Sequence, residues 1–580
     1  MYGSRANSRY LSTFRNQSSL LLCCFAIGCG AIVARLTYLQ IISGPKNRMI
    51  AYENRTRSIL RPPIRGRLLD RKGIVLATSS LKYNLYINPK TFNSPEWPRV
   101  RHQLSELLNL SPDKVEEYCN EEFKKNDYRL NVAKNLSTKQ VMNFFERRKD
   151  FKGIELDIET LRSYPHGSLA AHVMGYTSTL RREEYAKLKT EGYRIDDRIG
   201  RSGIERAYES TLRGSWGGQK LEVNALGKVQ RRLENNVPTA GADLQLTLDF
   251  RLQKAAEEAL RKVKKGAVVA MDAQTGAIRA MASHPSFDPN IFSPAPSIRQ
   301  WETLDSVRAP LVNRALRGFP PASTFKVVST IAALESGKYN TDSKILSTRS
   351  FCFEGQCYHD HVSLGLIDFP TALAISSNTV YYRVGLAVGS TELLKASEQM
   401  GYGSETGVEL VFEESKGSAG RKKGSEQDPS NSGNWSSVDT IVSAIGQGVL
   451  EVTPLQMARL YAAIGNGGWL VTPHLVEKPT VREAVGLKLE TLQVLHKGLR
   501  KVVTEGTATL LNDSSLPSVA GKTGTAENPP YADHTWFAGY APEKKPNLVV
   551  VVFCENSGGF GGTVAAPIAK ILLRTWFQET

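Results

Sequence analysis

The sequence predicts a mixed α+β fold behind a single transmembrane helix, and three stretches carry this prediction. An uncharged apolar run spans residues 20–34 and stays largely apolar up to Ile42. The stretch 43–240 is polar and mixed, whereas 241–580 alternates strand-like and helix-like patterns, with strands near both of its ends. We therefore expect a tail, an anchor, a non-catalytic domain and a C-terminal α+β domain at 1–19, 20–42, 43–240 and 241–580.

The apolar run is long enough to cross a membrane as a helix. At about 1.5 Å per residue, residues 20–42 cover the roughly 30 Å hydrocarbon core, and Arg35 can extend its charge toward the interface. Arg5, Arg9 and Arg15 precede the run without an acidic residue. Because basic residues favour the cytoplasmic side, we expect a cytoplasmic N-terminus and the rest of the chain outside.

A cleaved signal peptide is the alternative interpretation of this run, with its cleavage site near the small residues Gly28 and Gly30. Tyr38, Leu39 and Ile41 continue the apolar character beyond such a site. This continuation favours an uncleaved anchor.

The chain is basic, with a formal net charge of +17. This charge is compatible with nucleic acid, anionic lipid or an anionic polymer as a partner, or simply with a solvated basic surface. The basic residues are scattered, zinc-finger and RNP patterns do not occur, and the N-terminus indicates export. We therefore expect no nucleic-acid partner, and a solvated surface is the simplest interpretation.

Local patterns place several elements. A strand is expected at 244–248, followed by an amphipathic helix. Two strands flank a turn at 273–276, and an unbroken β-branched run makes 548–554 a buried strand. Thr453 is expected to cap a helix that stops at a Gly-Asn-Gly sequence. Further expected elements are a strand at 83–87, helices at 113–123 and 566–577, and a mobile polar loop at 414–434.

A Ser-x-x-Lys motif, Ser323 and Lys326, starts an apolar helical run that ends at Gly337. The spacing places both side chains on one helix face. A serine hydroxyl is a weak nucleophile until a base takes its proton, and a lysine serves as that base only when burial or nearby cations lower its pKa. The first helical turn also offers a favourable dipole and a backbone N–H for an oxyanion hole.

By itself this motif is weak. Three further Ser-x-x-Lys matches start at Ser43, Ser79 and Ser111, so chance explains most of them. Only the motifs that follow Ser323 in the chain distinguish it from the others.

Two further motifs complete a set. Ser376 and Asn378 form Ser-x-Asn directly before a helical stretch, whereas a second match, 432–434, falls in the polar loop and is incidental. The single Lys-Thr-Gly of the chain starts at Lys522, in a strand-like stretch. There the small Gly524 would let an extended substrate approach the backbone, while the lysine and threonine could hold its carboxylate.

The order Ser-x-x-Lys, Ser-x-Asn, Lys-Thr-Gly resembles the signature of penicillin-binding proteins and serine β-lactamases. From the anchor to the C-terminus, the chain resembles the class B penicillin-binding proteins. RGRLLDRKG (65–73), RSYPHGSLAAHVMGY (162–176) and GRSGIERAYES (200–210) resemble pedestal motifs, and MDAQTGAIRAMASHPSFDPN, FPPASTFK, AIGQGVLEVTPLQMA and AGKTGTAE resemble the transpeptidase pattern. The resemblance implies an elongated, dimerisation-type pedestal at 43–240 and a β-lactamase-like transpeptidase domain at 241–580.

The resemblance also implies a two-step reaction at the D-alanyl-D-alanine ends of peptidoglycan stem peptides. Ser323 would attack and release the terminal D-alanine, and an amino group of a neighbouring stem would resolve the acyl-enzyme into a crosslink. Lys326 would be the general base, Ser376 would pass the proton to the leaving amine, and Asn378 would hold Lys326 and the substrate amide. Lys522, Thr523, Gly524 and Thr525 would bind the substrate, with the backbone N–H groups of Ser323 and Thr525 as the oxyanion hole. No metal or other cofactor is implied, and β-lactam antibiotics would acylate the same serine.

Within the family, the resemblance favours the penicillin-binding protein 2 branch, which serves elongation and cell shape, over the septal branch. This preference depends on three stretches, FDPN, AIGQG and ENSGGFGGTVAAPIAK. Asn378 departs from it, because the elongation branch often has an acidic residue at this position. The chain has no room for a glycosyltransferase domain, which implies a separate SEDS-type polymerase (RodA or FtsW) as partner. An inner-membrane anchor with a periplasmic catalytic domain is implied as well.

Other outcomes of the same chemistry are less favoured. A D-alanyl-D-alanine carboxypeptidase or a β-lactamase uses the same residues and lets water resolve the acyl-enzyme, but a long anchored pedestal disfavours both. A catalytically silent β-lactam sensor is disfavoured because every motif position is intact.

Cys352 and Cys357 lie close together in FCFEGQCYHDH, and three interpretations stay open. The first is a disulfide across the short glycine-containing turn, and the second is a pair of free thiols. The third is a zinc site shared with His359 and His361, since relatives of the elongation branch carry metal-binding residues near this segment.

Overall fold

The structure is a computed structural model that describes residues 5–125, 130–133, 135–194, 197–223, 229–293, 298–304, 308–420 and 435–578. The chain forms two compact units. The first unit comprises Met1–Pro63 and Ser215–Ala240, and the second comprises Ile64–Gly214 and Gly241–Thr580.

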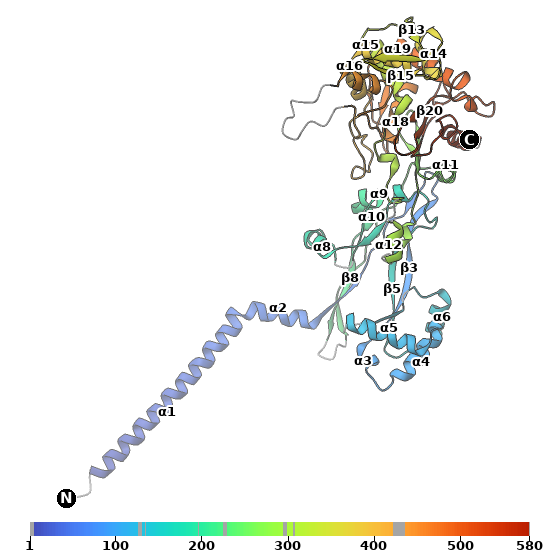
Figure 1. The fold of residues 1–580 in the computed structure, drawn as a ribbon. Coiled ribbons are helices and arrows are strands. Elements are labelled where there is room, and N and C mark those ends of the chain that lie inside the picture. The colour runs from blue at the N-terminus through green and yellow to red at the C-terminus, as the bar shows by residue number, and fades with distance from the viewer. Residues whose placement is uncertain are drawn as a thin grey trace. The chain divides into compact units, whose positions relative to one another are not determined.

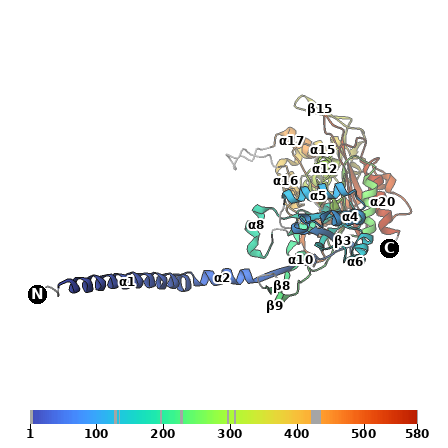
Figure 2. The ribbon, with the colours of Figure 1, turned by 90° about the horizontal axis from the view of Figure 1, so that it is seen from below.

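The first unit consists of two helices and a small sheet. Helix α1 (Arg5–Thr37) continues through the π-helical turn η1 (Tyr38–Ile42) and is followed by α2 (Gly44–Arg55) (Figures 1 and 2). Its antiparallel sheet has the order β1-β8-β9, formed by Thr56–Arg61, Gly217–Val223 and Val229–Asn236.

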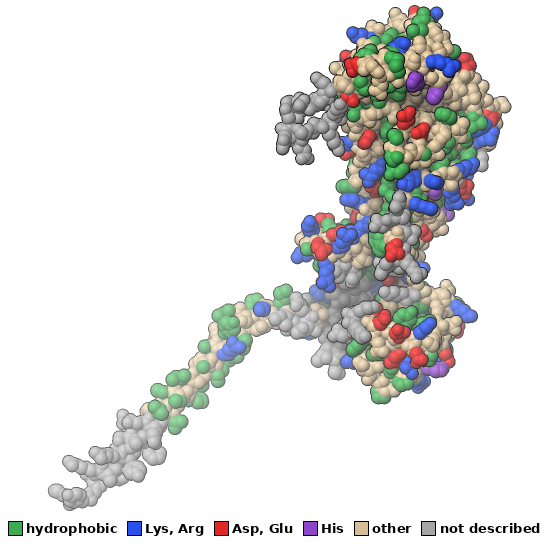
Figure 3. Space-filling model, in the orientation of Figure 1, with side chains coloured by type: hydrophobic (Ala, Val, Ile, Leu, Met, Phe, Trp, Pro, Cys, Tyr) green, Lys and Arg blue, Asp and Glu red, His purple; other side chains and the backbone are tan. Residues whose placement is uncertain are grey.

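The predicted anchor coincides with the apolar part of α1 and η1. In the described part of the chain, one helix is long and apolar enough to cross a membrane, Ser18–Ile42, with a mean hydropathy of 2.1. Its most apolar window is 0% buried inside the structure, and Figure 3 shows this stretch almost without charges. The segment is therefore a candidate membrane span.

The N-terminal part of the second unit is built around two long paired strands. Strands β3 (Val75–Ile87) and β5 (Ile154–Ser163) pair antiparallel from Thr78 opposite Ser163 to Ile87 opposite Ile154. Strand β3 also pairs with β2 (Leu68–Leu69) and β4 (Leu130–Ala133), and β2 pairs with β10 (Leu244–Gln245).

Helices cover one end of this sheet. They are α3 (Pro89–Phe92), α4 (Trp97–Leu108), α5 (Pro112–Lys125) and α6 (Thr138–Glu146). Apolar side chains of β3, β4 and these helices, including Leu85, Leu104, Leu130 and Phe144, form a core of their own. The strand predicted at 83–87 and the helix predicted at 113–123 are thus confirmed.

A buried ion cluster joins the three stretches that resemble pedestal motifs. Glu205 is completely buried and accepts hydrogen bonds from Arg65 Nε at 2.6 Å and from Arg162 Nε at 2.5 Å. Arg65 also donates to Glu209 at 2.7 Å. Burial alone raises the pKa of Glu205, but the two arginines hold it below its usual value. Each of the three stretches contributes at least one charged residue to the cluster, so the fold brings the three stretches together.

The short elements around this cluster are α7 (Ala171–Met174), β6 (Thr177–Thr179), α8 (Arg182–Leu188), η2 (Lys189–Glu191), β7 (Arg198–Gly200), α9 (Gly203–Ala207) and α10 (Glu209–Arg213).

Replacing Glu205 by alanine is expected to destabilise the second unit by about 3–5 kcal/mol, because the buried Arg162 loses its counter-charge and Arg65 keeps only Glu209. The urea dependence of tryptophan fluorescence measures this loss. The matched control is Glu146→Ala, an exposed change on α6 with an expected effect within about 0.5 kcal/mol. Equal stability of the two variants would show that the cluster is not needed for folding.

The C-terminal part contains a five-stranded antiparallel sheet with the order β12-β11-β21-β20-β19. Its strands are β11 (Gly266–Asp272), β12 (Ile278–His284), β19 (Ala520–Ala526), β20 (His534–Ala541) and β21 (Leu548–Cys554). Gly266 lies opposite Cys554 in the ladder between β11 and β21. The sequence ends of this part therefore pair in one sheet, as predicted.

Both faces of the sheet are covered by helices. Along β11, Val269 and Met271 face the core that contains α13 (Lys326–Glu335) and α18 (Pro454–Gly465). Val268 and Ala270 face the other core, which contains α11 (Phe250–Leu260) and α20 (Ala565–Phe577).

The remaining elements of the C-terminal part are η3 (Pro289–Phe292), α12 (Ile298–Leu304), η4 (Arg314–Leu316), η5 (Ala322–Phe325), β13 (Ile345–Ser347), β14 (Ser350–Phe353), β15 (Gln356–His359), β16 (Gly365–Ile367), α14 (Phe369–Ile375), α15 (Asn378–Val388), α16 (Ser390–Gln399), α17 (Ser437–Ser443), β17 (Trp469–Val471), β18 (Arg482–Ala484), α19 (Leu489–Thr504) and η6 (Thr509–Leu511).

Local sequence signals explain several element boundaries. The side chain of Thr453 accepts a hydrogen bond from the backbone of Gln456 and caps α18, as predicted. The strand predicted at 244–248 is shorter, because Leu246 forms a bridge with Val476 instead of continuing β10. Of the predicted mobile loop at 414–434, residues 421–434 lie outside the described residues.

Candidate functional site

Ser323 lies in the 3₁₀ turn η5, directly before α13 begins at Lys326. The prediction placed it in the first turn of the α-helix itself. The turn is tighter because Ala322 has a left-handed backbone, with φ of +52°, and donates its N–H to the carbonyl of Gly446 at 2.8 Å. A side chain at Gly446 would collide with the carbonyl of Ala322, so the AIGQG stretch shapes the turn that carries Ser323.

Lys326 is completely buried and points toward the Ser-x-Asn motif. Its Nζ donates to the carbonyl oxygen of Ser376 and to Oδ1 of Asn378, both at 2.7 Å, and lies 3.3 Å from Ser376 Oγ. Burial lowers the pKa of Lys326 to about 7, against the opposing effect of the Asp360 carboxylate. An amine with this pKa is about half neutral at pH 7 and can act as a base there, which meets the condition set by the sequence.

The Ser-x-Asn motif forms the turn between α14 and α15. Ser376 ends α14 in a left-handed conformation, with φ of +58°, and Ser377 caps α15 by accepting a hydrogen bond from Val380. Asn378 is the first residue of α15. Short polar side chains tolerate such a turn better than apolar ones, which explains why the helix breaks here.

Strand β19 brings Lys-Thr-Gly to the same place. Lys522 is buried, and its Nζ donates to Ser376 Oγ at 2.8 Å and to the carbonyl of Thr523 at 3.0 Å. Burial, and after it the neighbouring Lys326, lower the pKa of Lys522. The hydroxyls of Thr523 and Thr507 are 2.5 Å apart, and Thr525 Oγ1 accepts from the backbone of Gly561 at 3.3 Å.

Gly524 lies against the turn that carries Ser323. A Cβ at this position would lie 3.2 Å from the carbonyl oxygen of Pro321 and from Cγ2 of Thr324. The small residue therefore lets β19 approach the residues on both sides of Ser323. The prediction explained this glycine by the approach of a substrate, and the structure adds a packing reason.

The predicted site residues thus come together from three separate segments. Hydrogen bonds link Lys326, Ser376, Asn378 and Lys522, while η5 and β19 place Ser323 and Gly524 beside them. The other Ser-x-x-Lys matches lie elsewhere: Ser43 precedes α2, Ser79 lies in β3 and Ser111 precedes α5.

Sequence reasoning missed Asp360. Its Oδ2 accepts hydrogen bonds from Ser377 Oγ at 2.7 Å and from the backbone N–H of Thr379 at 2.9 Å. The only available signal was an acidic residue in the stretch FCFEGQCYHDH, whose interpretations concerned its cysteines and histidines. Thr507, beside Thr523, carried no motif at all.

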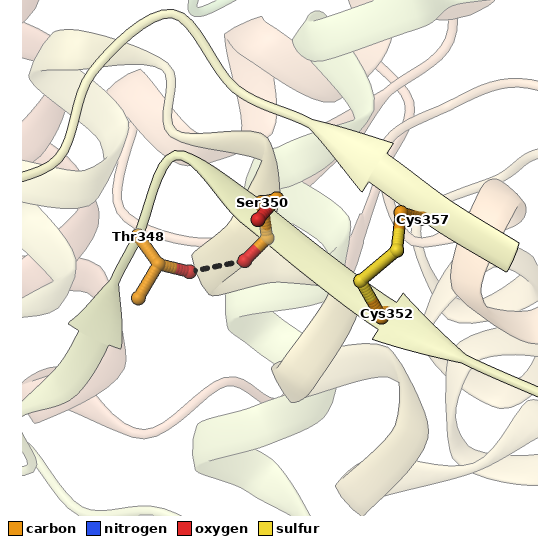
Figure 4. Close-up of a disulfide and its surroundings, with 4 residues drawn as sticks. All are labelled: Thr348, Ser350, Cys352 and Cys357. Atoms are coloured by element: carbon orange, nitrogen blue, oxygen red, sulfur yellow. Dashed lines mark hydrogen bonds between the residues drawn. A yellow bond between two sulfur atoms is a disulfide. The ribbon is translucent and has the colours of Figure 1, made fainter. Parts of the chain in front are cut away.

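Cys352 and Cys357 form a disulfide in the hairpin of β14 and β15, where they are directly opposite each other (Figure 4). This confirms the first of the three interpretations of the pair. Sulfur atoms joined in a disulfide are not thiolate ligands, so they do not contribute to a zinc site.

Comparison with known proteins matches this architecture. The family model of the penicillin-binding protein transpeptidase domain matches residues 266–574, and that of the penicillin-binding protein dimerisation domain matches residues 60–246. The chain belongs to the penicillin-binding proteins with a transpeptidase domain, and the predicted fold class, with its apolar N-terminal helix and pedestal, is confirmed.

Within this family, several curated relatives are named peptidoglycan D,D-transpeptidase MrdA. Peptidoglycan D,D-transpeptidase MrdA of Acinetobacter baumannii is 30% identical, with 95% of this chain and 87% of that protein covered. MrdA of Escherichia coli is 30% identical, with coverage of 94% and 91%. The solved structure of penicillin-binding protein 2 from Helicobacter pylori has a TM-score of 0.76 at 25% identity and covers 90% of this chain and 99% of its own. The resemblance to the penicillin-binding protein 2 branch is therefore confirmed.

Proposed function

We propose that this protein is a peptidoglycan D,D-transpeptidase of cell-wall elongation that crosslinks stem peptides through an acyl-enzyme on Ser323. The observation that carries the proposal is the position of Lys326, three residues after Ser323. This lysine is buried, has a pKa of about 7 and is hydrogen-bonded to the Ser-x-Asn turn. The curated relatives, named peptidoglycan D,D-transpeptidases, support the same reaction.

The contacts of Lys326 leave the lone pair of its amine free. A neutral amine has two N–H bonds and one lone pair. The two carbonyl oxygens at 2.7 Å, of Ser376 and Asn378, take the two N–H bonds. The lone pair then remains to accept the proton of Ser323 Oγ as this oxygen attacks the carbonyl of the penultimate D-alanine.

Ser376 is placed to move that proton onward. Its Oγ lies 3.3 Å from Lys326 Nζ and accepts a hydrogen bond from Lys522 Nζ. Because Lys522 only donates, the hydroxyl hydrogen of Ser376 is free for another acceptor, such as the nitrogen of the leaving D-alanine. Ser376 donates its own proton to this nitrogen and takes one from Lys326, so the C–N bond breaks and the ester on Ser323 remains.

The substrate is held by β19 in this proposal. Lys522 supplies positive charge for the terminal carboxylate, and the hydroxyls of Thr523 and Thr525 supply hydrogen bonds. The backbone N–H groups of Ser323 and Thr525 stabilise the oxyanion. An amino group of a second stem then attacks the ester, with Lys326 again as the base, and forms the crosslink.

We further propose a single-pass topology, with the N-terminus in the cytoplasm, the anchor at 20–42 in the inner membrane, and the pedestal (43–240) and catalytic domain (241–580) in the periplasm. The basic tail and the apolar helix support it. Proteolysis of spheroplasts tests it, because external protease would spare the catalytic domain if the topology were reversed.

We also propose a SEDS-type polymerase of the RodA kind as partner. A similar chain, with a TM-score of 0.75 at 30% identity, belongs to the structure reported as structural coordination of polymerization and crosslinking by a peptidoglycan synthase complex. Another similar chain was solved as a complex of penicillin-binding protein 2 with MreC from Helicobacter pylori. Co-purification of the full chain with RodA from its own cell envelope tests the partnership.

The fate of the acyl group distinguishes crosslinking from hydrolysis. We expect the full chain, supplied with a polymerase and its lipid-linked substrate, to produce crosslinked muropeptide dimers that mass spectrometry detects. We also expect its penicilloyl ester to persist long after free penicillin is removed. Release of D-alanine without dimers would indicate a carboxypeptidase, and rapid turnover of penicillin would indicate a β-lactamase.

A further inference from the structure

We propose that Asp360 is a positioning residue for the acylation step: carried on the disulfide-closed hairpin of β14 and β15, it holds the Ser-x-Asn turn that binds Lys326. The inference rests on the proposed function. It assigns a role to a hairpin that contributes no atom to the reacting groups.

The contacts of Asp360 fix the start of α15. One carboxylate oxygen accepts from Ser377 Oγ, from the backbone N–H of Thr379 at 2.9 Å, and lies 3.1 Å from Thr379 Oγ1. These two residues flank Asn378, whose side chain holds Lys326 at 2.7 Å. A carboxylate that accepts several hydrogen bonds at the start of a helix is strongly held there.

Thr379 is tied to the hairpin a second time. Its Oγ1 accepts from the backbone N–H of Thr348 at 3.1 Å and donates to the carbonyl of the same residue at 2.9 Å. The hydroxyl of Thr348 donates to the carbonyl of Ser350, the first residue of β14 (Figure 4). The backbone of Asp360 in turn donates to the carbonyl of Arg349 at 2.9 Å. Both ends of the hairpin therefore meet at the residue after Asn378.

The hairpin itself depends on its disulfide and on α15. Rings of Phe351 and Tyr358 pack on Tyr382, with centroids 6.0 and 5.2 Å apart. Both cysteines are exposed to solvent and lie outside the large cores of the chain. Because an isolated two-stranded hairpin is marginally stable, the covalent link keeps β15, and with it Asp360, in register.

Asp360 also acts on Lys326 through its charge. Among the described residues, the titratable groups that face this lysine are Lys522 from β19, Tyr381 from α15, whose ring centroid lies 5.6 Å from Nζ, and Asp360 from the hairpin. Of these, Asp360 carries the negative charge. Its removal therefore lowers the pKa of Lys326 further, whereas loosening the turn removes the contacts that aim the lysine.

The two effects are separable by two substitutions. Asp360→Asn keeps an oxygen that can accept from Thr379 but removes the charge, and Asp360→Ala removes both. In the full-length protein, we expect Asp360→Ala to reduce the second-order rate constant of acylation by fluorescent penicillin about 10- to 100-fold at alkaline pH. Asp360→Asn should retain most of the alkaline rate. Asp342→Asn, an exposed change before the hairpin, is the control.

The pH dependence of the acylation rate distinguishes the proposed role from a merely structural one, which would not change this dependence. Acylation requires neutral Lys326, so the rate rises as pH passes the pKa of this lysine. Without the negative charge this rise shifts to lower pH, and we expect the shift in Asp360→Asn but not in Asp342→Asn. An unchanged midpoint in Asp360→Asn, together with an alkaline rate of Asp360→Ala within about twofold of the parent, would overturn the proposal.

The disulfide adds an internal test. Reduction should slow acylation of the parent protein by at least about twofold and slow Asp360→Ala less, because only the contacts of Thr348 then link the hairpin to the turn. Equal slowing of both proteins would contradict the route through Asp360. Absence of labelling on Ser323 of the parent would instead refute the proposed function itself, so the two failures are distinguishable.

Discussion

Replacing Ser323 by alanine is expected to abolish covalent labelling of the full-length protein by penicillin. In the proposed mechanism the change removes the oxygen that forms the ester, and the expected loss in acylation rate is at least about 10⁴-fold. Ser323 is half-buried in η5, and the turn is held by the backbone of Ala322 and by the packing of Gly524. An alanine fits this turn, so the variant should keep its fold.

The matched control is Ser111→Ala, which removes the serine of another Ser-x-x-Lys motif. Ser111 is exposed and precedes α5, far along the chain from the transpeptidase motifs. We expect full labelling of this variant in the same gel assay, with circular dichroism confirming that both variants are folded. Persistent labelling of Ser323→Ala, mapped to another serine by mass spectrometry, would refute the assignment of the nucleophile.

Replacing Lys326 by arginine is expected to slow acylation about 10²- to 10⁴-fold, the usual contribution of a general base. The positive charge is retained, but a guanidinium does not lose its proton in this pH range. Burial lowers the pKa of Lys326 to about 7, so the parent gains the neutral base as pH rises through this value. The variant should therefore lack both the rate and its rise with pH.

The control for charge and size is Lys344→Arg, an exposed substitution on the same part of the chain. Stopped-flow acylation with a chromogenic cephalosporin between about pH 5 and pH 9 measures both variants and the parent. A Lys326→Arg variant that keeps the rising profile of the parent would show that another group is the base. A stability loss without a change in the profile would mean that Lys326 matters for packing only.

Motif order was enough to select residues that the fold brings together, because the chemistry of an acyl-transfer site constrains the residue types. Ser376, Asn378 and Lys522 were selected with Ser323 and Lys326 before any contact was known, and hydrogen bonds now link four of these five side chains. Element prediction succeeded where a strong local signal exists, as at the Thr453 cap and at 548–554.

The parts that sequence could not supply depend on contacts between distant segments. The tight turn before α13 needs the carbonyl of Gly446, and the shortened β10 needs Val476. Asp360 has no periodic or motif signal, because its hydrogen-bond partners are distant in sequence and only the fold brings them to it. Lys522 was expected to meet a substrate carboxylate, whereas its hydrogen bond to Ser376 depends on the fold, which brings β19 to the turn before α15.

The order of strands in the central sheet has a consequence for the synthesis of this protein. Strand β11 needs β21 as its neighbour, and Lys522 arrives on β19, so the sheet and the reactive cluster both wait for the last segment of the chain. The candidate membrane span, Ser18–Ile42, is synthesised long before these parts. Under the proposed function, we expect a shortened product that ends before Ala520 to be inert, because it lacks Lys522 and three strands of the sheet.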